Sequence, residues 1–168
     1  MTARSDATPA RGASLLLLAA IVALALNLRP AMAAVGPLLD LIEGATGMGS
    51  TAASLLTTLP VLMIGLGALS IRPLRRRLGE RRGILLGALL IGAACLVRAV
   101  LIGATGLIAS AVVVGVGVAL IQALAPVVIK RAFPAQFGTV MALYTTGIMA
   151  GAAVAAATAA GLAEKIGW

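Results

Sequence analysis

Long apolar stretches separated by short polar segments account for nearly all of this chain. Each stretch has at least 20 residues, and a helix of that length crosses the ~30 Å hydrocarbon layer of a bilayer at about 1.5 Å of rise per residue. The five stretches cover residues 13–39, 50–71, 83–102, 107–129 and 137–163. The pattern therefore predicts an all-α fold, a polytopic bundle of five membrane-spanning helices.

The polar segments divide the chain into a tail and a transmembrane domain. Residues 1–12 offer too little apolar surface to order themselves, so we expect a disordered cytoplasmic tail. The transmembrane domain then covers residues 13–168. A glycine-rich loop over residues 40–49 predicts that the first two spans are antiparallel neighbours, and the short connection 103–106 predicts the same for the third and fourth.

The composition lies far from that of water-soluble domains. Hydrophobic residues make up 61% of the chain and charged residues 11%, with a mean hydropathy of +1.13. The net charge of +8 would suggest nucleic-acid binding in a soluble protein. Membrane orientation and the anionic inner leaflet account for these arginines instead, so we expect a lipid bilayer and no nucleic acid as the partner.

The basic residues fall on alternate connections between the spans. Short cytoplasmic loops carry an excess of Lys and Arg. If the N-terminus is inside, ten basic residues are cytoplasmic, namely Arg4, Arg11, Arg72, Arg75, Arg76, Arg77, Arg81, Arg82, Lys130 and Arg131, and only Lys165 is outside. The predicted location is the plasma membrane, as a multi-pass bacterial inner-membrane protein with a cytoplasmic N-terminus.

The chain offers few residues for catalysis or metal binding. It has no histidine, and its single cysteine, Cys95, lies within the third apolar stretch. There is thus no disulfide framework and no cluster of metal ligands. No Asp or Glu falls within any of the five stretches. Because an enzyme needs a nucleophile, a base or a metal site, we expect no catalysis and no cofactor.

Arg29 and Arg98 place positive charge within apolar spans, at a cost of about 2.5–3.5 kcal/mol each. Arg29 lies near the middle of the first span, too deep to reach either surface easily, which predicts a water-filled cavity or an anionic ligand. The alternative is a structural pair with an acidic residue outside this sequence. Arg98 lies about four residues, or ~6 Å, from the outer end of the third span, and we expect its side chain to reach the headgroups.

Polar side chains within the other spans supply further binding candidates. Gln122 precedes Pro126 by four residues in the fourth span, so both lie on one helix face. Its amide suits either a polar substrate or a bridge to a neighbouring helix. Asn27, Thr57 and Tyr144 are the remaining candidates for contact with a substrate. Two intramembrane arginines and no intramembrane acid predict a small anionic or strongly electronegative solute as cargo.

Glycines recur four positions apart within the spans, as at Gly83 and Gly87 and again at Gly147 and Gly151. Between helices in lipid the attraction comes from packing, and small residues let two backbones approach closely. We therefore expect these glycines to pack helices and not to contact a substrate.

The arginine-rich connection after the second span resembles the signature loop of the major facilitator superfamily, usually G-x-x-x-D-R-x-G-R-R. Its R-x-G-x-R part is matched by Arg77, Leu78, Gly79 and Arg81, whereas Arg76 replaces the Asp and Arg72 the first Gly. More specific strings are Asn27-Leu28-Arg29-Pro30, residues 55–62, Pro126 with Ile129-Lys130-Arg131, Phe133-Pro134, and Leu143-Tyr144-Thr145-Thr146. Together they resemble the cyanate and 2-nitroimidazole transporter family over residues 13–163.

The resemblance implies twelve helices in two six-helix halves that alternately open a central site to either side. Helices one and four line that site, which implicates Arg29 and Gln122. The family usually has Asn where Gln122 stands, and this departure bears on substrate identity. Because only five spans precede Trp168, we expect the N-terminal part of a secondary active transporter whose missing C-terminal half is its partner. The alternative is a small membrane subunit or helper that acts only in an oligomer.

Overall fold

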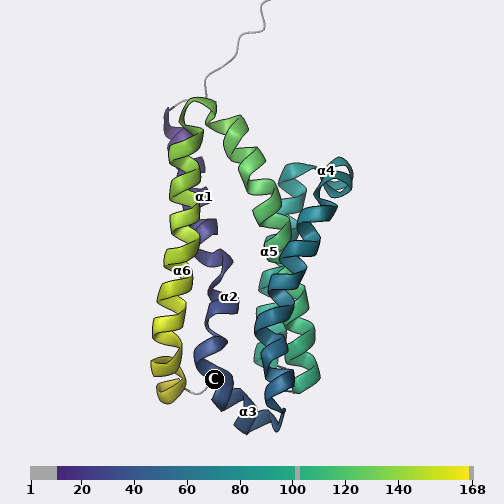
Figure 1. Ribbon diagram of the computed structural model, residues 1–168. Helices are drawn as coiled ribbons and strands as arrows, with labels where there is room; N and C mark the ends of the chain where they lie inside the picture. Colours follow the sequence, from purple (N-terminus) through teal and green to yellow (C-terminus); the bar gives the residue numbers. More distant parts are fainter. Residues whose placement is uncertain (1–10, 101–102, 167–168) are drawn as a thin grey trace, which may run out of the picture.

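The computed structural model describes residues 11–100 and 103–166, and the regular structure in these residues is helical (Figure 1). The elements in order are α1 (Arg11–Leu28), α2 (Pro30–Ala33), the 3₁₀ helix η1 (Gly36–Leu38), α3 (Leu39–Thr46), α4 (Ser50–Val100), α5 (Ala104–Ala132), the 3₁₀ helix η2 (Pro134–Gln136) and α6 (Phe137–Ile166). Most of the predicted tail lies outside the described residues.

Five segments of these helices are long and apolar enough to cross a membrane. They cover Ser14–Thr46, Ser50–Leu69, Leu78–Val100, Ala104–Ala132 and Pro134–Lys165. The prediction of an all-α bundle with five spans is thereby confirmed.

The first span is interrupted near its middle, between α1 and α2. Pro30 begins α2, and proline has no N–H to donate to the carbonyl of Leu26, four residues earlier. Arg29 precedes this break with φ −109° and ψ −11°. The sequence pattern alone gives one uninterrupted apolar stretch here, so the break is a feature that hydropathy does not reveal.

The first span also continues as a helix beyond its expected end. A loop over residues 40–49 was predicted, but α3 runs to Thr46 and ends at Gly47, whose φ of 66° lies in the left-handed region. That conformation suits glycine after the last helical turn. The loop prediction was wrong because Ile42, only 4% exposed, packs beside Val35 and Leu56 and keeps α3 against the bundle.

Helix α4 consists of two antiparallel legs joined by a bend. Gly79 lies at the bend with φ 70° and ψ 172°, a backbone conformation that only glycine adopts without strain. Figure 1 shows α4 folding back on itself at this point. The connection predicted over the arginine-rich segment is therefore a sharp turn between helices.

Helix α5 contacts both legs of α4 through small residues. A Cβ atom at Gly115 would lie 2.7 Å from Pro60 Cα on the first leg, and one at Gly87 would lie 2.7 Å from the carbonyl oxygen of Gly117. A Cβ atom at Gly83 would meet Leu124. The packing role predicted for Gly83 and Gly87 is confirmed, since a Cβ atom at Gly87 would meet backbone and one at Gly83 would displace the Leu124 side chain.

Helix α6 packs along the broken first span. A Cβ atom at Gly147 would lie 3.1 Å from Ala25 Cβ, and one at Gly151 would meet the backbone of Leu26. The second glycine therefore brings α6 against the same carbonyl that Pro30 leaves without its helical donor. The packing role predicted for this pair is likewise confirmed.

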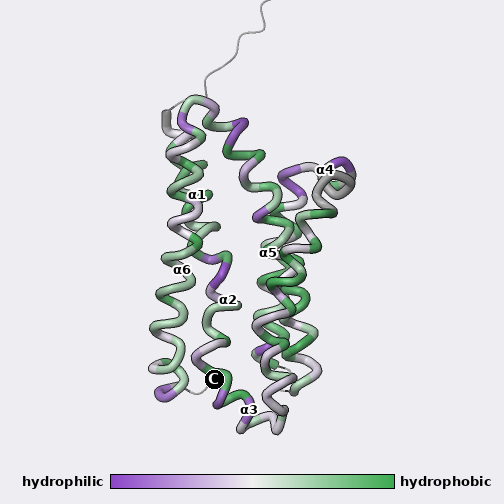
Figure 2. The backbone as a smooth tube through the Cα atoms, in the orientation of Figure 1, coloured by the Kyte–Doolittle hydropathy of each residue, from purple (hydrophilic) through white to green (hydrophobic). Residues whose placement is uncertain are grey.

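Charged residues gather at one end of the bundle. Figure 1 places the start of α1, the bend of α4 and the turn from α5 to α6 at this end, which we call the basic end. There Arg131 Nη1 lies 2.7 Å from Glu80 Oε2 and ties the end of α5 to the bend of α4. Figure 2 shows a further hydrophilic stretch at mid-length, where α1 passes into α2.

Candidate functional site

The break in the first span presents Arg29 in the interior of the bundle. Its backbone carbonyl accepts hydrogen bonds from the N–H groups of Met32 at 3.0 Å and Ala33 at 2.9 Å, which begin the short helix α2. Its side chain is half-buried, and the buried Nε atom has no hydrogen-bond partner within the described residues. The guanidinium is therefore held at mid-depth with a free donor.

Arg29 lines an open cavity of about 470 Å³ together with residues of α5 and α6. The other lining residues are Gln122, Pro126, Met141, Tyr144, Thr145, Ile148 and Met149. Gln122 and Pro126 lie one helical turn apart on α5, as the sequence predicts, and Pro126 cannot donate to the carbonyl of Gln122. Arg29 in the first span and Gln122 in α5 thus each lie within one helical turn of a proline.

Tyr144 contributes a second unpaired polar atom to the cavity. The side chain is 3% exposed, and its hydroxyl has no hydrogen-bond partner within the described part of the chain. A buried polar group without a partner costs about 1–3 kcal/mol. Both groups belong to residues that line one cavity, where a ligand or ordered water that accepts hydrogen bonds can supply the missing partners.

The cavity is electrostatically positive. Arg29 supplies a permanent charge, and the lining residues include no carboxylate. Its polar groups are the guanidinium and hydroxyl donors and the amide of Gln122, which also accepts. Thr145 is less available, because its hydroxyl donates to the carbonyl of Met141 at 2.9 Å. The arrangement suits a small anion or a solute rich in hydrogen-bond acceptors.

Two of the five candidate residues lie elsewhere. Asn27 donates from Nδ2 to the carbonyl of Ala23 at 2.9 Å and lines a different cavity of about 340 Å³. Thr57 is exposed and donates from Oγ1 to the carbonyl of Ser54 at 2.9 Å. The structure therefore brings together Arg29, Gln122 and Tyr144 and leaves these two outside their cavity.

The apolar part of the lining was absent from the candidate set. Met141 and Ile148 lie three residues before and four residues after Tyr144 on α6. Residues at these spacings share one helix face with it. The helical spacing around a candidate aromatic residue was thus the signal that would have identified them.

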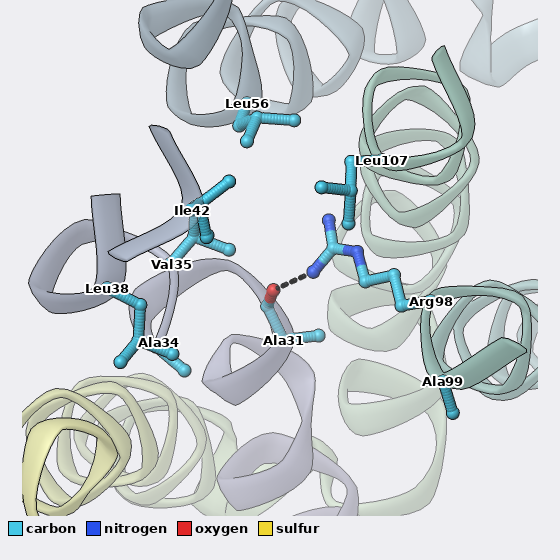
Figure 3. Close-up of a pocket in the computed structure, with 9 residues that line it drawn as sticks. All are labelled: Ala31, Ala34, Val35, Leu38, Ile42, Leu56, Arg98, Ala99 and Leu107. Carbon is cyan, nitrogen blue, oxygen red and sulfur yellow. Dashed lines mark hydrogen bonds between the residues drawn. The ribbon is translucent and has the colours of Figure 1, made fainter. Parts of the chain in front are cut away.

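The sequence suggested that the Arg98 side chain reaches the headgroups, but in the structure it turns into the bundle. Its Nε donates to Ser110 Oγ at 2.8 Å and its Nη1 to the carbonyl of Ala31 at 2.7 Å (Figure 3). That prediction was wrong because the break in the first span alters the backbone hydrogen bonding. Val35 donates to Met32 at 3.3 Å and not to Ala31, so the Ala31 carbonyl is available to an arginine.

Comparison with known proteins places this architecture in a family. The sequence matches the model of the Major Facilitator Superfamily over residues 13–168. The chain belongs to the major facilitator superfamily. The superfamily resemblance predicted from the short motifs is thereby confirmed, and the membrane-spanning helices are those of a transporter family.

Three curated relatives refine this assignment. The chain is 38% identical to the cyanate transport protein CynX of Escherichia coli strain K12, over 84% of this chain and 37% of the relative. It is 34% identical to the uncharacterized transporter YycB of Bacillus subtilis strain 168, over 90% and 38% of the respective chains. It is also 34% identical to the 2-nitroimidazole transporter of Escherichia coli strain K12, over 92% and 39%.

This chain spans well under half the length of each of these relatives. The matches include both proteins whose family the short motifs resemble.

Proposed function

We propose that this chain forms the first five spans of a secondary active transporter that moves a small anionic or polar solute by alternating access. The superfamily match and the transporter names of the relatives support transport. Because the chain covers 37–39% of those relatives, the remaining helices of the transporter are proposed to come from sequence beyond these spans.

The observation that carries the proposal is that two residues with unpaired polar atoms line one cavity. Arg29 Nε comes from the break in the first span, and Tyr144 OH comes from α6. Gln122 lies in the same lining. We assign cargo contact to these three residues, with the guanidinium holding the charged or most electronegative group of the solute.

The proposed cargo is cyanate-like or nitroimidazole-like. The names of two relatives point to these solutes. Cyanate is an anion and a nitro group carries two electronegative oxygens, so both present acceptors to a guanidinium and a hydroxyl. The cavity of about 470 Å³ exceeds the size of either solute, which fits a site that the rest of the transporter closes.

The test is uptake by cells that express the natural gene. Radiolabelled cyanate and 2-nitroimidazole are offered separately to the wild type, Arg29→Lys and Arg29→Ala. We expect reduced, low-affinity uptake in Arg29→Lys, because lysine keeps the charge and loses the planar set of donors. We expect no uptake in Arg29→Ala at normal membrane levels of the protein. Lys130→Ala is the control, since it removes an exposed charge at the basic end. Unchanged uptake in Arg29→Ala would refute the assignment.

The same proposal places the basic end in the cytoplasm of a bacterial inner membrane. This orientation rests on the excess of Lys and Arg at that end. In a Cys95→Ala background, a cysteine at Ala45 on exposed α3 should react with an impermeant thiol reagent added outside. A cysteine at exposed Arg82 should react only after the cells are opened. The reverse pattern would overturn the orientation.

A further inference from the structure

A third cavity lies between the later part of the first span and the helices α4 and α5. Its volume is about 290 Å³, and its lining residues are Ala31, Ala34, Val35, Leu38, Ile42, Leu56, Arg98, Ala99 and Leu107. Figure 3 shows these side chains around a common space, with Arg98 entering it from α4. Arg98 is the only charged or polar side chain among them, so an otherwise apolar wall surrounds one guanidinium.

The charge of Arg98 is not neutralised within the described residues. The one ion pair in that part of the chain joins Arg131 to Glu80 at the basic end. The partners of Arg98 are a backbone carbonyl and a hydroxyl, both of them uncharged. A guanidinium has five N–H donors, and these two bonds occupy two of them.

The free donors of Arg98 are accessible from the cavity. In Figure 3 one terminal nitrogen bonds to Ala31, and the other is directed into the space among Ile42, Leu56 and Leu107. An anion there would gain charge-assisted hydrogen bonds in a surrounding of low polarity, where such bonds are strong.

We infer that this cavity is a binding site for an amphiphilic anion, separate from the cavity at Arg29. The anionic group pairs with the free donors of Arg98, and an apolar body contacts Val35, Ile42 and Leu56. At about 290 Å³ the cavity lies at the lower limit of small-ligand sites, which are about 300–1,000 Å³, so it accepts a ligand no larger than one aromatic carboxylate or a phosphate with the first part of an acyl chain. A bare inorganic ion would leave the apolar wall unused.

The position of the site connects it to the first span. Ala31 follows Arg29 by two residues, and its carbonyl is one of the two present partners of Arg98. An anion that draws the guanidinium toward itself competes with this carbonyl. Occupancy of the site therefore biases how firmly the broken span is attached to α4.

The experiment uses the natural transporter, purified and placed in nanodiscs of phosphatidylcholine. The probe is 2-naphthoate, a carboxylate on an apolar bicycle, and 2-naphthylmethanol is its neutral match. Equilibrium dialysis should show saturable binding of the carboxylate and at least about tenfold weaker binding of the alcohol, because the charge-assisted bonds are lost. Cyanate should not displace naphthoate. The outcome at this cavity is therefore independent of whether the proposed transport site at Arg29 is correct.

Two variants distinguish a lost site from a lost fold. Arg98→Gln keeps a donor for Ala31 and removes the charge, and Ala34→Leu fills the cavity and leaves Arg98 unchanged. Both should weaken naphthoate binding by about tenfold or more, whereas Arg29→Gln should leave it unchanged. Equal binding in the wild type and both cavity variants would overturn the proposal, as would no saturable binding at all or an equal loss in Arg29→Gln.

A second set of nanodiscs, which contain phosphatidylglycerol, tests whether the natural anion is a lipid or a soluble molecule. Naphthoate binding is measured in both sets. At high salt, which screens the surface charge of the discs, weaker naphthoate binding in the discs with phosphatidylglycerol would identify an anionic lipid as the occupant. Equal binding in both kinds of disc would identify a soluble organic anion. Either result requires the saturable, Arg98-dependent binding that defines the site.

Discussion

Arg29 and Arg98 are both arginines within membrane-spanning helices, yet their surroundings differ. Arg98 gives two of its donors to Ser110 and to the carbonyl of Ala31, and so joins α4 to the first span and to α5. Arg29 lies at the break itself, and its buried Nε is unpaired beside an open cavity. The difference teaches that depth in a hydropathy profile does not separate an arginine that joins two spans from one whose buried donor is unpaired. The two arginines are distinguished by whether the backbone leaves an acceptor free within reach of the guanidinium.

The largest expected effect on stability belongs to Arg98→Ala. The variant removes the donor of the part-buried Ala31 carbonyl and one of the two hydrogen bonds of Ser110 Oγ, and each hydrogen bond from a charged donor contributes about 1.5–3 kcal/mol. The unfolding temperature of the purified transporter should fall clearly, and that of Arg29→Ala should change little. A fall of the same size in both variants would remove the distinction between the two arginines.

Next in size is Gly151→Ala, which tests how α6 holds the broken span. A Cβ atom at Gly151 meets the backbone of Leu26, whereas one at Gly161 on the same helix meets nothing within 4 Å. Overpacking of this kind costs about 1–3 kcal/mol. Thermal unfolding should therefore begin at a lower temperature in Gly151→Ala than in the matched Gly161→Ala. Equal curves would show that α6 does not fix the break through this contact.

The smallest expected effect is that of Gln122→Ala. One neutral hydrogen bond contributes about 0.5–1.5 kcal/mol, so the affinity of uptake should fall by roughly 2- to 13-fold. The amount and thermal stability of the protein should stay near those of the wild type. If stability and uptake decline together, Gln122 bridges helices and does not contact the cargo.

The sequence was sufficient for the coarse architecture. Each span is long and predominantly apolar, and this property does not depend on how the helices pack. The five helices were therefore predictable. The glycine pairs were predictable for a related reason. Close helix approach needs small residues at i and i+4, and Gly83 with Gly87 and Gly147 with Gly151 have no competing use.

The missed features depend on the backbone at Pro30. Proline removes one helical donor, but the sequence does not tell whether the helix bends or breaks, and so the free carbonyl of Ala31 was not foreseen. Without that acceptor, Arg98 was expected at the surface. Asn27 lies apart from the Arg29 cavity, and its Nδ2 donates to the carbonyl of Ala23 one turn earlier on its own helix.

The measurement that tests the central claim most directly is protection of the purified natural transporter against heat by its cargo. The ligand is cyanate or 2-nitroimidazole, whichever the wild type takes up, at about 100 times its Kd, where binding adds about 2.7 kcal/mol. The unfolding temperature should rise with cargo in the wild type and in Lys130→Ala, and should not rise in Arg29→Ala. A rise in Arg29→Ala equal to that of the wild type would contradict the account, because the cargo would then bind without the arginine that the broken span presents.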